Sequence, residues 1–306
     1  MGRISFLLSI VVTATAIAQE GRIVYTKFDG LPPWHSDLYR MNGDGSERVA
    51  LTRDGQSRNP RWSPDGKRIV FVQSFAMDSS QLVVMDADGK KRQVLARMSW
   101  IGSATWSPDG SSFAMVARTP SLATLSQDPI WSGLYLLPAN GKGKLRLLFP
   151  SVATASWSPD GKKIAFAKEG PRGQWSVWVS LADGTGDLRL TAPEPDLGNV
   201  AWSPDGAWIS AQTEGKIFVI REDGRGRKAV PMPRGWLCRS TAWTPDARHL
   251  VASCSAGPVG CGGPSSTGQI LPPCELRLFR LPLDGKSAAV RLGDPQAREA
   301  DVSLRE

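Results

Sequence analysis

Histidine is scarce in this chain of 306 residues, which contains only His35 and His249. A Ser-His-Asp triad would have to use one of them. The chain also has no Gly-x-Ser-x-Gly elbow, no Gly-x-x-x-x-Gly-Lys-Ser/Thr phosphate loop, no His-Glu-x-x-His helix and no dinucleotide-binding glycine fingerprint. The sequence therefore predicts no catalytic residues and no enzymatic activity. We interpret both histidines as solvent-facing polar side chains, with His35 also a candidate binding residue.

Long apolar runs are absent after residue 18. Before it, Arg3 precedes the apolar stretch from Ile4 to Ala18, which ends in the small-x-small triplet Ala16-Ile17-Ala18. This pattern predicts a signal peptide over residues 1–18, cleaved before Gln19, and no transmembrane segment. The stretch has no cysteine for lipid attachment. Residues 19–306 are expected to form one exported domain, periplasmic or secreted.

Cysteine is limited to Cys238, Cys254, Cys261 and Cys274. Export permits disulfides. If Thr244 faces its partner Arg248 across the intervening turn, Cys238 faces Cys254 on neighbouring strands. We therefore expect the pairs Cys238–Cys254 and Cys261–Cys274, although four cysteines allow three connectivities. The spacing has no Cys-x-x-Cys pair and His249 is alone, so no metal site and no cofactor are predicted.

One five-residue motif, called here the repeat phrase, recurs along the chain. It occurs five times, as Trp62–Gly66, Trp106–Gly110, Trp157–Gly161, Trp202–Gly206 and the altered copy Trp243–Ala247. Four copies read Trp-Ser-Pro-Asp-Gly, and the tryptophans are 44, 51, 45 and 41 residues apart. A recurring turn phrase at such a period is typical of a repeat architecture.

Each copy predicts a β-hairpin. Proline presets φ, aspartate bonds nearby backbone and glycine takes the left-handed position. An apolar run such as Ile69–Val72 follows, then a third run such as Gln81–Asp86, an Asp-Gly or Asn-Gly turn and a fourth strand. Four antiparallel strands per repeat predict an all-β propeller.

The two turn types give different blade counts. The Asp-Gly or Asn-Gly turn occurs six times but the tryptophan phrase only five, because the first unit begins at its second strand, 21–26. Near the C-terminus, Ala300–Leu304 resembles the inner strand Ala153–Trp157. We therefore predict six four-stranded blades, with the ring closed by residues 299–304 pairing with 22–26 and leaving no free edge.

The Trp-Ser-Pro-Asp-Gly phrase, the Ile-Ala-Phe run at 164–166 and the Asp-Ala-Asp-Gly turn at 86–89 resemble the TolB-type propeller repeat, also called the PD40 repeat. The resemblance covers roughly residues 21–306. It implies a propeller without the small N-terminal domain of TolB, and an interaction role in the cell envelope. The same blade serves many roles, so the resemblance is weaker for activity than for architecture.

The loops separate by face. The Pro-Asp-Gly and Asp-Gly turns are short and uniform and would share one rim, here the short-turn rim. The second-to-third-strand loops and the blade connections vary in length and would share the other, here the irregular rim. Irregular loops on a rigid scaffold commonly bind ligands. Five candidate binding residues belong to the irregular rim: Trp34, His35, Trp100, Trp131 and Trp236.

Two interpretations of these tryptophans stay open. They can pack in the core or rim, or they can line an aromatic channel mouth that grips a peptide, a glycan or a partner loop. The repeat tryptophans are instead expected to pack between blades. The short-turn rim is rich in lysine and arginine and the net charge is +8, which we interpret as favouring solubility, with binding of anionic lipid or polysaccharide the alternative. Asp86 and Asp88 are interpreted as turn residues rather than calcium ligands.

Three functions remain in view. The first is a non-catalytic, monomeric interaction module whose partner is an envelope protein. The second is a small-ligand, glycan or peptide binder that uses the aromatic mouth. The third is a hydrolase or lyase, for which the chain has too few histidines. Nucleic acid is not an expected partner, because the chain is exported and has no dedicated binding motif.

Overall fold

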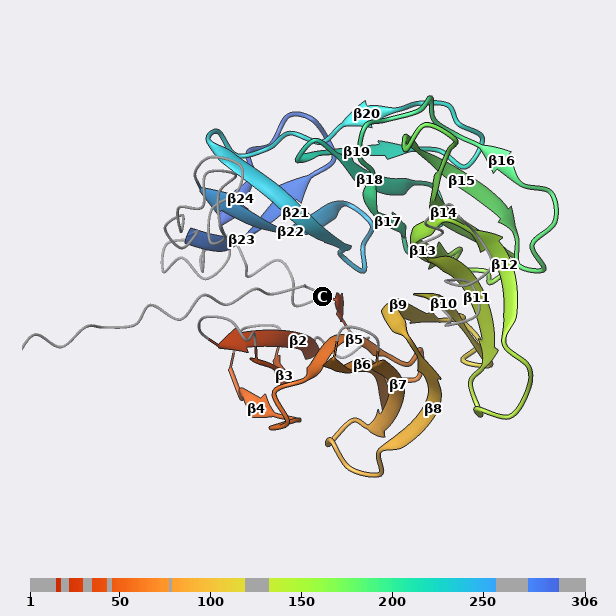
Figure 1. Cartoon of the computed structure of the whole chain (residues 1–306). Coiled ribbons are helices and arrows are strands. Elements are labelled where there is room, and N and C mark those ends of the chain that lie inside the picture. The colour runs from red at the N-terminus through yellow and green to blue at the C-terminus, as the bar shows by residue number, and fades with distance from the viewer. Residues whose placement is uncertain are drawn as a thin grey trace, which may run out of the picture.

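A computed structural model shows a ring of six four-stranded antiparallel sheets (Figure 1). The structure describes residues 15–17, 22–29, 35–42, 46–76, 79–118, 132–256 and 275–291. Every helix or strand in these residues is a β-strand. The predicted all-β propeller of six four-stranded blades is confirmed.

The first three blades follow one another along the chain. Blade 1 contains β1 (Thr15–Ile17), β2 (Arg22–Asp29), β3 (His35–Asn42) and β4 (Val49–Ala50). Blade 2 contains β5 (Ser57–Trp62), β6 (Arg68–Ala76), β7 (Ser79–Asp86) and β8 (Gln93–Met98). Blade 3 contains β9 (Trp100–Trp106), β10 (Ser112–Arg118), β11 (Gly133–Pro138) and β12 (Arg146–Pro150).

The last three blades repeat the pattern. Blade 4 contains β13 (Val152–Trp157), β14 (Lys163–Glu169), β15 (Trp175–Leu181) and β16 (Leu188–Arg189). Blade 5 contains β17 (Gly198–Trp202), β18 (Ile209–Thr213), β19 (Lys216–Ile220) and β20 (Lys228–Ala229). Blade 6 contains β21 (Trp236–Trp243), β22 (His249–Ala256), β23 (Glu275–Pro282) and β24 (Val290–Arg291).

The repeat phrase forms the first hairpin of each blade after blade 1. In blade 2 the Ser63 hydroxyl donates to Asp65 Oδ1 at 2.6 Å, and the Lys67 N–H donates to the same oxygen at 3.1 Å. Gly66 has φ +66°, the left-handed region that favours glycine. The Ser63 hydroxyl and the Lys67 N–H hold the pKa of Asp65 below its usual value. The turn aspartate therefore orders the backbone, as predicted.

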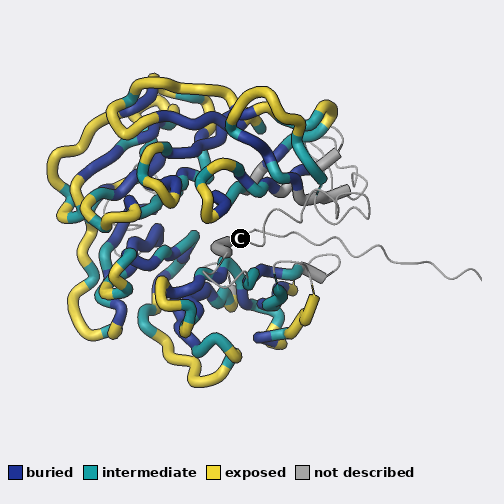
Figure 2. Tube along the Cα trace, turned by 180° about the vertical axis from the view of Figure 1, so that it is seen from behind, coloured by how far each residue is buried: buried dark blue, intermediate teal, exposed yellow. Residues whose placement is uncertain are grey.

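The blades bury their faces against one another. Trp106 of β9 lies in one buried cluster with Val70, Val72 and Leu82 of blade 2, and Trp243 of β21 lies in another with Ile217 and Val219 of blade 5. Clusters of this kind join each pair of consecutive blades from blade 1 to blade 6. Figure 2 shows buried positions along the strands and exposed ones at the turns and outer strands. The expected packing role of the repeat tryptophans is confirmed.

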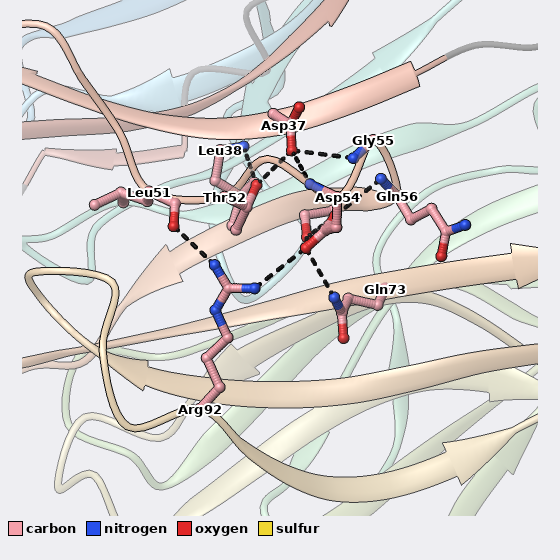
Figure 3. A network of polar contacts seen from close by, with 10 residues as sticks. Asp37, Leu38, Leu51, Thr52, Asp54, Gly55, Gln56, Gln73 and Arg92 are labelled. Carbon is pink, nitrogen blue, oxygen red and sulfur yellow. Dashed lines mark hydrogen bonds and ion pairs between the residues drawn. The ribbon is translucent and has the colours of Figure 1, made fainter.

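A polar joint ties blade 1 to blade 2 (Figure 3). Asp37 of β3 accepts hydrogen bonds from the Thr52 hydroxyl at 2.8 Å and the Asp54 N–H at 2.9 Å. Asp54 in turn accepts from Gln73 Nε2 at 3.0 Å and Arg92 Nη1 at 3.3 Å. Arg92 also donates to the Leu51 carbonyl at 2.9 Å. The blade connection is therefore held by side chains from both blades.

Ring closure differs from the prediction. The inner strand of blade 1 is β1, in which Thr15 pairs with Val24 and Ile17 with Ile23. β1 also contacts β5 on one side and β21 on the other, so it links the first and last blades. The predicted closing strand, Ala300–Leu304, lies outside the described residues. The sequence argument assigned β1 to the signal peptide, and therefore did not consider it as a strand.

Cleavage before Gln19 would remove β1 and leave the inner edge of β2 unpaired. We expect residues 299–304 to occupy that edge in the cleaved chain, because an unpaired edge strand is unfavourable and prone to aggregation. Deletion of residues 299–306 should then sharply lower the melting temperature of a chain that begins at Gln19. The same deletion should affect the uncleaved chain less. Equal melting temperatures with and without the deletion in both chains would contradict closure by the C-terminal segment.

The altered fifth turn places a non-glycine residue at positive φ. Ala247 has φ +55° at the position where Gly66 has φ +66°. Because an L-residue is strained there, Ala247→Gly should raise the free energy of unfolding by about 1 kcal/mol. The matched control is Gly66→Ala, which should lower it by a similar amount, since open space surrounds the added Cβ and only the backbone is strained. Denaturant unfolding measures both, and a destabilised Ala247→Gly variant would refute the argument.

Candidate binding site at the irregular rim

The described candidate residues share the irregular rim. His35 begins β3, Trp100 begins β9 and Trp236 begins β21, and first and third strands all start at this rim. They belong to blades 1, 3 and 6, so they lie at separate places around the axis and do not form one cluster. Trp34 and Trp131 lie outside the described residues.

Trp100 is half-buried at the start of blade 3. It packs against the cluster that joins blades 3 and 4, and its ring lies so close over Gly102 that a side chain there would collide with it. The neighbouring Ser99 hydroxyl donates to the Arg118 carbonyl at 2.7 Å and fixes the strand end. Trp100 therefore sits rigidly, with only part of its ring available to a ligand.

Trp236 is half-buried at the start of blade 6. Its ring meets Phe279 edge to face, with centroids 4.9 Å apart. Two residues further on, Cys238 forms a disulfide with Cys254, joining β21 to β22. The disulfide fixes the strand that carries Trp236. Cys261 and Cys274 lie outside the described residues, so their predicted pairing is untested.

The disulfide has the predicted partners although the assumed register was wrong near the turn. Trp243 pairs with Leu250, so Thr244 faces His249 rather than Arg248. A β-bulge between Cys238 and Ser240 then adds one residue to β21 and brings Cys238 opposite Cys254. The one-residue error in the assumed register at the turn and the extra residue of the bulge therefore offset each other, so the predicted cysteine pair is still correct.

His35 is exposed, and its side chain lies beside Gly55 in the connection between blades 1 and 2. The N–H of the next residue, Ser36, donates to the Gly55 carbonyl at 2.9 Å. A side chain at Gly55 would touch the His35 ring. His249 lies on the opposite, short-turn rim with Nδ1 3.6 Å from Asp246 Oδ2. The two histidines therefore cannot serve one site.

The same bulge recurs on the inner strands, and sequence analysis missed it. β5, β9, β13, β17 and β21 each carry one extra residue relative to the second strand of their blade. In β5 the bulge includes Asn59, with φ +53°, whose Nδ2 donates to the Gly102 carbonyl of β9 at 2.6 Å. In β17 the equivalent Asn199, with φ +51°, donates to Gln212 Oε1 at 2.7 Å. Asparagine tolerates this conformation.

Two arginines flank the bulge of β5. Arg58 Nη2 donates to the Ile101 carbonyl of β9 at 3.4 Å, and Arg61 Nη1 to the Pro60 carbonyl at 3.3 Å. Burial lowers the pKa of both guanidinium groups, that of Arg61 to about 10. Both arginines are half-buried, and a partly buried charge with no carboxylate partner in the described part of the chain is unfavourable for folding. Sequence analysis gave these residues no role, although each stands in a strand whose counterparts are largely small and neutral.

The short-turn rim is largely self-neutralised. Lys90 lies 3.1 Å from Asp88, Lys91 3.2 Å from Asp86, and Lys163 2.9 Å from Glu222. The Lys90 N–H holds the pKa of Asp88 below its usual value. In the described part of the chain no three His, Cys, Asp or Glu side chains group as metal ligands would. These ion pairs offset part of the positive charge of the short-turn rim.

The fold and the repeats define a six-bladed propeller built from TolB-type blades. The family model described as the TolB beta propeller domain matches residues 11–259. The chain belongs to this family. No curated protein sequence matches it.

Solved structures share the fold at low sequence identity. A putative TolB from Agrobacterium tumefaciens is 20% identical, with a TM-score of 0.61 over 80% of this chain and 84% of that one. TolB from Acinetobacter baumannii is 18% identical, with a TM-score of 0.65 over 88% of this chain and 65% of that one. An oligogalacturonate lyase from Vibrio parahaemolyticus is 16% identical, with a TM-score of 0.61 over 92% and 77%.

No helix in the described residues is long and apolar enough to cross a membrane. The disulfide is consistent with an oxidising compartment such as the periplasm.

Loss of the disulfide should weaken blade 6. The double variant Cys238→Ser/Cys254→Ser should lose about 2–3 kcal/mol of unfolding free energy, because the bond closes a short loop in the unfolded chain. Denaturant unfolding measures the loss, with Cys261→Ser/Cys274→Ser as the matched control. Peptide mapping without reductant should recover Cys238 linked to Cys254. Recovery of Cys254 linked to Cys261 or Cys274 would refute the assigned register.

Proposed function

We propose that the protein is an exported, non-catalytic binding module of the cell envelope that holds a macromolecular partner on its irregular rim. The observation that carries the proposal is the position of Trp100 and Trp236. Both are half-buried aromatic side chains fixed at strand starts on one rim. Partly exposed tryptophans on a rigid scaffold are typical anchors of protein interfaces.

Family membership supports the same role. The chain belongs to the TolB propeller family, and the signal-peptide pattern together with the disulfide suits export. We place the protein in the periplasm or outside the cell, as a monomer.

A small-ligand, glycan or peptide binder is the second candidate. It is favoured by the two arginines of β5, which lie beside the axis and form no ion pair with a carboxylate of the described residues. The likeness to the oligogalacturonate lyase, at 16% identity, concerns the fold alone. Incubation of the protein with oligogalacturonate should therefore give no unsaturated product, and product formation would overturn the non-catalytic assignment.

The tryptophans should decide affinity. Covalent capture from envelope extract, run beside a glycan array, supplies the partner or ligand. Trp100→Ala and Trp236→Ala should each weaken its binding roughly 30-fold or more, because a buried aromatic anchor typically contributes ~2 kcal/mol or more. Thermal melts of each variant separate lost contact from lost folding, since both rings also pack against blade cores.

The control variants lie on the other rim. Lys90→Ala and Lys91→Ala remove charges paired with turn aspartates and should change affinity little, and mainly at low salt. Arg92 is unsuitable as a control because it holds the joint between blades 1 and 2. Loss of affinity in the lysine variants alone would assign the binding face to the short-turn rim.

A further inference from the structure

Arg58 and Arg61 lie on the same face of blade 2. They are three residues apart, a spacing that would place them on opposite faces of a regular strand. The bulge changes this, because Arg58 pairs with Val72 and Arg61 with Val70, and these partners are two residues apart. Val70 and Val72 both belong to the cluster shared with blade 3. Both arginines therefore face blade 3.

The face that carries Arg58 and Arg61 lies at the innermost part of the interface between blades 2 and 3. β5 and β9 are the inner strands of blades 2 and 3 and contact each other beside the axis of the ring (Figure 1). The bonds from Arg58 to the Ile101 carbonyl and from Asn59 to the Gly102 carbonyl cross this contact. Ile101 and Gly102 directly follow Trp100, so the arginines adjoin the candidate rim.

In the described part of the chain, no acidic side chain compensates the charge of Arg58 and Arg61. The positions equivalent to Arg61, one residue before the repeat tryptophan, are Thr105, Ser156, Ala201 and Ala242. The inner strands β1, β5, β9, β13, β17 and β21 contain no aspartate or glutamate. Among the described residues, no carboxylate forms an ion pair with either arginine.

The donors of these arginines are also incompletely used. Arg58 Nε is buried and has no hydrogen-bond partner. Arg61 is half-buried, and among the described residues its one hydrogen bond goes to the carbonyl of its own neighbour, Pro60. Other arginines of the ring have a packing role that these two lack, since Arg22 and Arg68 stack on Trp62 and Trp106. Stability alone does not account for Arg58 and Arg61.

We propose that Arg58 and Arg61 form an oxyanion-binding site at the axial end of the blade 2–blade 3 interface, which takes a carboxylate or phosphate group. The planar fork of a guanidinium matches both groups and binds them through paired N–H donors. Bound oxyanion would supply the missing negative charge and accept from the unused donors. The proposal rests on the proposed binding function and names the chemistry of the group that the rim accepts.

Small anions test the site without a macromolecular partner. The full-length protein is titrated with sodium phosphate and, separately, sodium succinate, each against sodium chloride at equal ionic strength. Calorimetry and thermal melting are the readouts. Phosphate or succinate should raise the melting temperature beyond chloride, because a ligand that binds only the folded state stabilises it. Whichever anion acts more strongly identifies the preferred group.

Two substitutions should remove the effect. Arg61→Met and Arg58→Met should each weaken anion binding tenfold or more, whereas Arg97→Met should not. Arg97 is the matched control because it is exposed on the outer strand β8 and its loss changes the net charge equally. Arg61→Lys keeps the charge but loses the fork, so it should fold normally and bind more weakly.

Stability without anion separates binding from structure. Arg61→Met should melt at or above the wild-type temperature, because it removes a half-buried charge that has no carboxylate partner among the described residues. The proposal is overturned if wild type gains nothing over chloride, if Arg97→Met loses as much binding as Arg61→Met, or if Arg61→Met melts lower and still binds. Anion binding with no effect of the tryptophan variants on partner capture would instead leave this site standing and refute the proposed function.

Discussion

The blades of this protein have no interior of their own, so each must bury its faces against its neighbours. Trp106 packs on Val70 and Val72 of the preceding blade, and Trp243 packs on Ile217 and Val219 in the same way. The chain is therefore stable only as a ring, and the first and last blades must be joined. In the described residues that join is β1, which contacts both β5 and β21. In the uncleaved chain, ring closure therefore depends on three residues near the N-terminus.

The inner strands share one irregularity. All six converge beside one axis, and each carries an extra residue that frees its local backbone from the regular alternation of faces. The protein uses this freedom differently in different blades. In β17 it directs Asn199 to Gln212, whereas in β5 it puts two arginines on one face. A half-buried cation with no counterion among the described residues opposes folding, and such a feature is more easily understood at a binding site than in a scaffold.

The two rims differ because the turns of one have a repeated backbone geometry and the loops of the other do not. On the short-turn rim, hydrogen bonds such as Ser63 to Asp65 fix every turn in one geometry, and lysines pair with turn acids. The irregular rim has no such template. There the blade connection is held by a joint specific to its sequence, in which Asp37, Asp54 and Arg92 take part. Variation between the described blades is therefore greater on the rim where Trp100 and Trp236 lie, and binding specificity can change there without disturbing the repeated turns.

The sequence alone determined the architecture, because the Trp-Ser-Pro-Asp-Gly phrase encodes a local turn and a packing residue whose meaning does not depend on distant parts of the chain. It also placed His35, Trp100 and Trp236 on one rim and paired Cys238 with Cys254. Only the tertiary structure decided the rest. The segment that closes the ring in the described residues is β1, whose pairing with β2 the sequence pattern did not indicate. The spacing of Arg58 and Arg61 would place them on opposite faces of a regular strand, and only the pairing with β6 reveals the bulge that puts them on one face. Whether a described carboxylate reaches them depends on every strand that meets at the axis.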